Sequence, residues 1–288
     1  MTDPSVGIQL YSVRKALAND FFGTLERIAE IGYQNIEMYF ESPYFARFDV
    51  PCPSAELRKK TGELGLNILN SHVVHHKYLN WDEVIRYNVE IGSGGITIPL
   101  YLYNLNQNNS QVEEALEFSE WMNQFGKKCS ENGMKLYYHN YFNEFEISDG
   151  KHIFDILLEN TDPDYVGFEL DVYWTKRGGV DPVNWMDRVG TRCELLQVQD
   201  LRADAKNINL VETVSSFDNA FWPKIHTHYG DYTEIGTGIL DLCGIIKKAK
   251  ELGSVSCVVS SQMEAGKKSE LESAKENYET LQKLVKGL

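Results

Sequence analysis

Short runs of β-branched and aromatic residues alternate with helical patterns along the whole chain of 288 residues, and this alternation limits the fold more than any other feature. Strands separated by helices form parallel βαβ units, because a parallel pair needs a long crossover connection. Eight strand segments can be assigned: Gly7–Tyr11, Asn35–Tyr39, Asn67–His72, Ile96–Leu100, Lys135–His139, Val166–Asp171, Glu194–Gln199 and Val255–Ser260. A helical pattern follows each strand, and a barrel of eight such units typically has ~250 residues. The sequence therefore predicts an α/β fold, a single (β/α)8 TIM barrel over residues 1–288.

Helix starts and one long connection refine this prediction. Ser110 and Glu113 form a capping-box pattern, and Asp181 followed by Pro182 is typical of a helix N-terminus. The longest connection, roughly residues 201–238, follows the seventh strand. Long loops after barrel strands usually cover or build the site, which lies at the C-terminal ends of the strands.

Composition and charge exclude several classes of protein. The chain is 42% hydrophobic and 24% charged, which is ordinary for a globular protein, and no apolar run approaches the roughly 20 residues that span a bilayer. A net charge of −14 opposes binding to a phosphate backbone, so we expect no nucleic acid and no membrane as partners. Five cysteines without CxxC spacing and a start without signal-peptide features predict a cytoplasmic protein.

Polar residues occupy the inward positions of several strands. In the sixth strand Val166, Phe168 and Leu170 are expected to face the helices, so Glu169 and Asp171 point to the barrel axis. The same alternation directs further polar side chains inward: Gln9, Tyr11, Glu37, Asn70, His72, His139, Gln197 and Gln199. Barrel interiors are ordinarily filled with Val, Ile and Leu, and a buried carboxylate is costly. The set predicts a polar binding cavity, and the alternative is a satisfied hydrogen-bond network within the core.

Seven phrases occur in an order that resembles one known family. They are GIQLYSVR, NSHV, YHNYFNEF, GFELDVYW, GVDPVNWM, LLQVQD and EIGTGILDL. Together they resemble the xylose-isomerase-like sugar phosphate isomerase/epimerase family over essentially the whole chain. The resemblance implies a (β/α)8 barrel that isomerises, epimerises or dehydrates a sugar, polyol or keto-sugar. It also implies one divalent metal ion, which polarises the substrate oxygens while a proton next to a carbonyl is removed.

The metal ligands of the resembling enzymes are only partly present. The resemblance implies Asp171 as one ligand and either Glu144 or His139 as another. Gln197 stands at the usual histidine position, and Ser261 or Ser260 stands at the usual second glutamate position. Amide and hydroxyl groups hold transition metals weakly. We therefore expect no metal or a weakly bound manganese, cobalt or magnesium ion, unless His226 and His228 of the long loop supply ligands.

By resemblance, the catalytic candidates are Glu144, Asp171 and His139. The substrate-binding candidates are Gln9, Tyr11, Glu37, His72, Trp174, Gln197 and Gln199. Trp174 has two interpretations, a stacking surface for the apolar face of a sugar or a helix-packing side chain.

The functional hypothesis is a sugar phosphate isomerase/epimerase-like enzyme with a degraded metal site, acting on a small sugar-like molecule by proton transfer next to a carbonyl. One alternative is a non-catalytic carbohydrate-binding barrel or subunit partner. A remote alternative is a metal-dependent DNA-repair endonuclease, which the acidic charge opposes. Homo-oligomerisation is left open.

Overall fold

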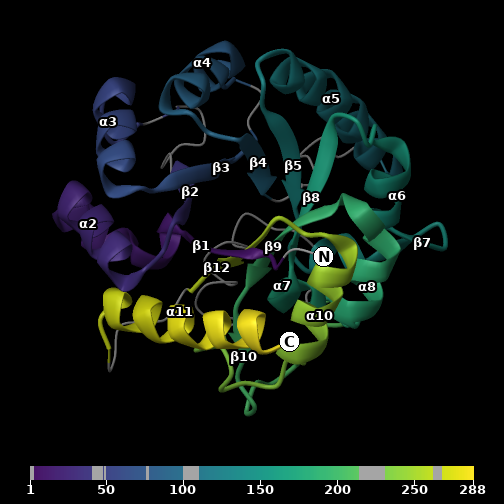
Figure 1. The fold of residues 1–288 in the computed structure, drawn as a ribbon. Coiled ribbons are helices and arrows are strands. Elements are labelled where there is room, and N and C mark those ends of the chain that lie inside the picture. Colours follow the sequence, from purple (N-terminus) through teal and green to yellow (C-terminus); the bar gives the residue numbers. More distant parts are fainter. Residues whose placement is uncertain are drawn as a thin grey trace.

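Eight parallel strands close into a barrel in the computed structural model, which describes residues 3–40, 48, 50–75, 78–99, 110–213, 231–261 and 268–288. The barrel order is β1-β12-β9-β8-β5-β4-β3-β2, and the helices lie around the outside (Figure 1). The barrel strands are β1 Ser5–Gln9, β2 Asn35–Phe40, β3 Asn67–Val73, β4 Gly95–Pro99, β5 Lys135–His139, β8 Val166–Asp171, β9 Cys193–Val198 and β12 Ser256–Val259. The predicted (β/α)8 barrel fold is confirmed.

Strand bounds agree with the sequence prediction to within two residues. β5 and β8 have the predicted bounds, whereas β1 begins at Ser5 and ends at Gln9. The 3-10 helix η1, Leu10–Val13, follows β1 directly, so Tyr11 lies in η1 and its assignment to a strand was wrong. Because η1 starts directly after Gln9, Tyr11 lies beyond the end of β1.

The helices are α1 Arg14–Asn19, α2 Phe21–Ile31, α3 Ser54–Leu64, α4 Trp81–Ile91, α5 Gln111–Glu131, α6 Ile153–Asn160, α7 Val172–Arg177, α8 Pro182–Val189, α10 Leu242–Leu252 and α11 Glu270–Gly287. Ser110 and Glu113 form the expected capping box of α5, and Asp181 caps α8. The expectation of one helix per strand is wrong, because both α7 and α8 follow β8. Gly179, with a φ of +80°, lies between these two helices.

Two short 3-10 helices and two short antiparallel strand pairs lie between the barrel elements. They are η2 Asn143–Phe145, η3 Gly190–Arg192, the antiparallel pair β6 Ile147–Ser148 with β7 Lys151–His152, and the antiparallel pair β10 Asp200–Leu201 with β11 Tyr232–Thr233. β10 and β11 are the two ends of the predicted long connection, whose middle lies outside the described residues. None of the helices in the described ranges is long and apolar enough to cross a membrane.

The ring of Tyr137 on β5 lies between glycines of the two neighbouring strands, β4 and β8. Gly95 and Gly167 flank the ring of Tyr137, and a Cβ atom at either glycine would come within 2.8 Å of it. The Tyr137 hydroxyl donates a hydrogen bond of 3.2 Å to Glu194 Oε2.

Candidate functional site

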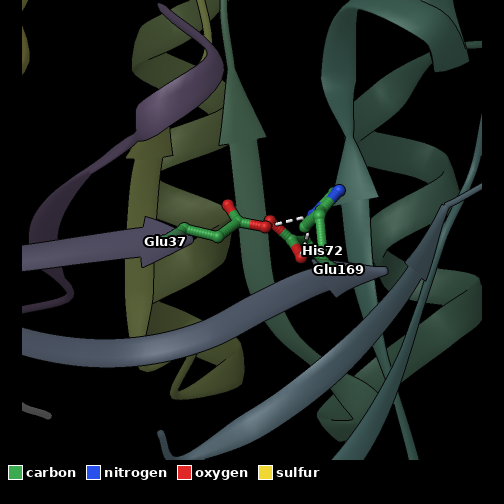
Figure 2. A group of neighbouring side chains, drawn as sticks. All are labelled: Glu37, His72 and Glu169. Carbon is green, nitrogen blue, oxygen red and sulfur yellow. Dashed lines mark hydrogen bonds and ion pairs between the residues drawn. The ribbon is translucent and has the colours of Figure 1, made fainter. Parts of the chain in front are cut away.

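Two carboxylates and an imidazole meet inside the barrel (Figure 2). Glu37 comes from β2, His72 from β3 and Glu169 from β8, and all three are buried. His72 Nε2 lies 3.1 Å from Glu169 Oε2 and also forms an ion pair with Glu37 Oε1. We call Glu37, His72 and Glu169 the inner cluster. It is the one group of three His, Cys, Asp or Glu side chains within the described residues whose ligand atoms converge on a point.

Two neutral side chains hold Glu169 in place. Asn70 Nδ2 donates to Glu169 Oε2 at 3.0 Å, and Thr97 Oγ1 donates to the same oxygen at 2.9 Å. Thr97 was missed by the sequence argument, although its inward position in the fourth strand was a usable signal. Both contacts stabilise the ionised form of Glu169.

Burial and mutual charge set the protonation of the inner cluster. Burial raises the pKa of Glu37 to about 8, and the neighbouring Glu169 carboxylate adds to the shift. Burial alone lowers the pKa of His72, but Glu37 and Glu169 outweigh it and raise that pKa to about 10. Burial alone raises the pKa of Glu169, but the His72 charge outweighs it and lowers that pKa to about 2. Near pH 7 the cluster therefore holds His72 as a cation, Glu169 as an anion and Glu37 as a neutral acid.

A second group of polar side chains lies at the strand ends, and we call it the outer cluster: His139, Asp171, Gln197 and Gln199. His139 Nε2 lies 3.1 Å from Gln197 Oε1 and 3.4 Å from Asp171 Oδ2. Gln199 Nε2 donates to Asp171 Oδ2 at 3.2 Å. Asp171 Oδ1 accepts the Trp174 amide at 2.8 Å and so caps α7, which fixes the carboxylate.

Amide side chains connect the two clusters. Gln197 Nε2 lies 3.2 Å from His72 Nε2, and the His72 and His139 rings are 5.1 Å apart at their centroids. Gln9 Nε2 approaches His72 at 3.4 Å, and Ser260 Oγ donates to Gln9 Oε1 at 3.3 Å. The inward positions that the alternation identified thus form one connected polar interior.

Glu144 lies in η2, the element that follows β5. Its carboxylate accepts a hydrogen bond from the Tyr138 hydroxyl and another, of 3.0 Å, from the Tyr141 amide. The Tyr138 ring contacts Phe154 and Phe168, in the layer between the barrel wall and the helices. Glu144 therefore anchors the turn that follows β5.

Two aromatic candidates lie at the barrel mouth. Trp174 is only 1% exposed and stacks on Tyr141, with ring centroids 5.0 Å apart. Trp174 is therefore packed among other side chains, and Tyr141 lies against one face of its ring. Tyr11 is partly exposed and meets Tyr39 edge to face at 4.7 Å.

The described residues at the position where the resembling enzymes hold metal do not fit a metal ion. Asp171 and His139, whose Oδ2 and Nε2 atoms lie 3.4 Å apart, are its only strong ligands among the described residues. The Gln197 amide contacts His139 through its oxygen and His72 through its nitrogen. Open catalytic zinc sites usually keep three protein ligands of strong type. We therefore derive no chemical step through an ion at this position.

The structure also distinguishes Ser260 from Ser261 as the residue at the usual position of the second glutamate. Ser260 is buried and faces Gln9, whereas Ser261 Oγ lies 3.4 Å from Ser273 Oγ on α11. Successive side chains after β12 point to opposite sides, so Ser260 rather than Ser261 occupies the inward position. His226 and His228 lie outside the described residues.

Comparisons with known proteins agree with the barrel fold. No family model matches the chain. An inosose dehydratase of Geobacillus kaustophilus is 31% identical over 124 residues, which are 43% of this chain and 37% of that enzyme. An inosose dehydratase of Mesomycoplasma hyopneumoniae is 22% identical over 212 residues, 67% of this chain and 69% of that enzyme. The first match thus spans little more than a third of that relative's length.

A solved structure covers the whole barrel. The sugar phosphate isomerase/epimerase of Parabacteroides distasonis superposes with a TM-score of 0.74 and 24% identity, covering 99% of this chain and 96% of that one. The chain therefore has the barrel fold of the xylose isomerase-like sugar phosphate isomerase/epimerase proteins, as the sequence resemblance implied.

Proposed function

We propose that this protein is a carbohydrate-acting enzyme that binds a sugar-like or cyclitol-like ketone at the barrel mouth and removes a proton next to its carbonyl. The observation that supports it most is the connected polar interior at the C-terminal strand ends, where such barrels have their active sites. Proton removal at that carbon begins isomerisation, epimerisation and the dehydration of a β-hydroxy ketone. The names of the similar proteins, inosose dehydratase and sugar phosphate isomerase/epimerase, support the same class of substrate.

His139 is the base in this proposal. Acceptor oxygens of Gln197 and Asp171 face its Nε2 atom, so that nitrogen carries the proton. Its Nδ1 atom is buried and has no hydrogen-bond partner within the described part of the chain, so its lone pair is free to accept a proton. A carboxylate that orients an imidazole in one tautomer is a recurring arrangement for general bases. The amide groups of Gln197 and Gln199 can donate hydrogen bonds to substrate oxygens.

Deuterium exchange tests this function directly. We expect the protein, incubated in D2O with inososes and keto-sugars, to incorporate deuterium next to the carbonyl of one of them, as followed by NMR. His139→Ala should lower that rate by about 10²–10⁴-fold, the usual contribution of a general base. The exposed Lys127→Ala on α5 is the control and should leave the rate unchanged.

A non-catalytic carbohydrate-binding barrel is the second candidate, favoured by Gln197 and Ser260 at the positions of the histidine and second glutamate ligands in the resembling enzymes. Calorimetric binding of a sugar with no exchange and no conversion would favour this candidate. Absence of both binding and exchange over the whole panel would contradict both functions.

A further inference from the structure

We propose that the inner cluster of Glu37, His72 and Glu169 is a binding site for a divalent transition metal ion. One donor atom from each of the three residues lies within 4.8 Å of the other two. Ligand atoms on opposite sides of a zinc-sized ion lie about 4.0–4.4 Å apart, because each metal–ligand distance is about 2.0–2.2 Å. One imidazole nitrogen and two carboxylate oxygens suit Zn²⁺, Mn²⁺ or Co²⁺. His72 Nε2 now contacts Glu37 Oε1 and lies 3.1 Å from Glu169 Oε2 (Figure 2), so the three side chains must move apart to surround one ion.

Unpartnered oxygens in the inner cluster provide a second, independent observation. Glu37 Oε2, Glu169 Oε1 and Asn70 Oδ1 are buried and have no hydrogen-bond partner within the described residues. The three residues are 0% exposed, and all three atoms are acceptors once the carboxyl groups are ionised. Buried polar atoms are rarely left unpaired, because the loss of water is costly. A cation would compensate for this excess of acceptor oxygens.

A divalent ion would take the place of two protons. The empty cluster holds one proton on Glu37 and an extra one on the His72 cation, and loss of both leaves two carboxylates and a neutral imidazole, whose charge of about −2 a divalent cation neutralises. Glu37 and Glu169 come from β2 and β8, whose residues are not paired in the barrel order, and His72 comes from β3. The ligands therefore approach the ion from different sides of the barrel, and the barrel framework holds them.

The proposed site is distinct from the position where the resembling enzymes hold metal. Glu169 precedes Asp171 by two residues on the same strand, so the inner cluster lies deeper by about 6.6 Å along β8. His72 would be a ligand rather than the substrate contact that the sequence predicted. The inference does not depend on the proposed function, since an ion can bind here whether or not the outer cluster is catalytic.

Metal binding to the full chain tests the inference without an activity assay. The protein is dialysed against a chelator, then titrated with MnCl2 or ZnCl2 alone in a calorimeter, and its metal content is measured by elemental analysis. We expect one ion per chain. Glu37→Gln should lower the affinity by at least about 10-fold, since even the loss of an outer-shell partner costs 10–100-fold. Asp171→Asn is the matched control, a carboxylate-to-amide change in the outer cluster that should alter affinity less than about 3-fold.

A spectroscopic readout on the wild type keeps the test valid if Glu37→Gln does not fold. We expect bound Mn²⁺ to broaden the NMR signals of the His72 ring before those of His152, which lies in β7 outside the barrel. The inference is overturned if no ion binds. It is also overturned if Asp171→Asn abolishes binding while Glu37→Gln retains it, because the ion would then lie in the outer cluster.

Discussion

Protonation of the buried Glu37 side chain makes the stability of the fold depend on pH. In the metal-free protein its pKa of about 8 and the His72 pKa of about 10 both exceed those of the unfolded chain. A group with a raised pKa stabilises the fold fully below its unfolded pKa and loses that contribution as pH rises through its folded pKa. The Glu169 contribution has the opposite sign, since its pKa is lowered to about 2, and it is lost only in acid.

The first prediction follows at this scale. Between about pH 6.5 and 8 the free energy of unfolding of the chelator-dialysed protein should fall as pH rises, by up to about 1.4 kcal/mol per pH unit for each of the two groups. Urea denaturation at several pH values measures this slope. Glu37→Gln removes one titrating group and should make the slope clearly shallower. An unchanged slope in that variant would show that Glu37 does not hold the proton.

Packing around the Tyr137 ring limits the size of the side chains that β4 and β8 can carry beside it. The Tyr137 ring from β5 lies against Gly95 of β4 and Gly167 of β8. A ring of this size fits inside the barrel only because both neighbours lack a Cβ atom. The glycine in GFELDVYW is therefore explained by the space that the ring needs.

Gly167→Ala is the second prediction. Its Cβ atom would lie 2.8 Å from Tyr137 Cε1, too close for a real contact, so the ring or the strand must shift. We expect a loss of about 1–3 kcal/mol in the free energy of unfolding, the usual cost of overpacking a core. Chemical denaturation measures it.

Gly62→Ala is the matched control for this change. Gly62 is exposed in α3, and a Cβ atom there meets nothing within 4 Å. This substitution should stabilise the protein by about 0.5–1 kcal/mol, because alanine is the better helix former. Equal effects of the two substitutions would contradict the packing argument.

Closure of the barrel joins the two ends of the chain. β1 pairs with β12, so that Ser5 lies opposite Ser256 and Ile8 opposite Val259. α11 lies beside this seam, and its residue Ala274 accepts a hydrogen bond of 2.9 Å from the Tyr33 hydroxyl. Strands at the two ends of the chain are therefore expected to unfold together rather than fray separately.

The third prediction belongs to the whole molecule. Leu281 of α11 is 0% exposed, and Leu281→Ala should lower the free energy of unfolding by about 2–5 kcal/mol. Far-UV circular dichroism and tryptophan fluorescence, which reports on distant residues such as Trp121, should shift to the same urea midpoint. The exposed Lys283→Ala should change stability by less than about 0.5 kcal/mol. Separate midpoints for the two probes would show that α11 unfolds independently.

Local periodicity in the sequence determined the barrel and the direction of its polar side chains. The bounds of β5 and β8 and the inward positions of Glu37, His72, Glu169 and Gln197 follow from an alternation of period two. The cap of α8 at Asp181 likewise follows from neighbouring residues.

Only the tertiary structure decided which of these side chains meet. Glu37 and Glu169 are 132 residues apart, and closure of the barrel brings both to His72. It also decided that Glu144 accepts from the Tyr138 hydroxyl and that Tyr141 covers Trp174. The physical reason is the distance along the chain over which each feature is determined. Alternation along a strand is fixed by the local backbone, whereas contact across the barrel depends on the register and packing of all eight strands together.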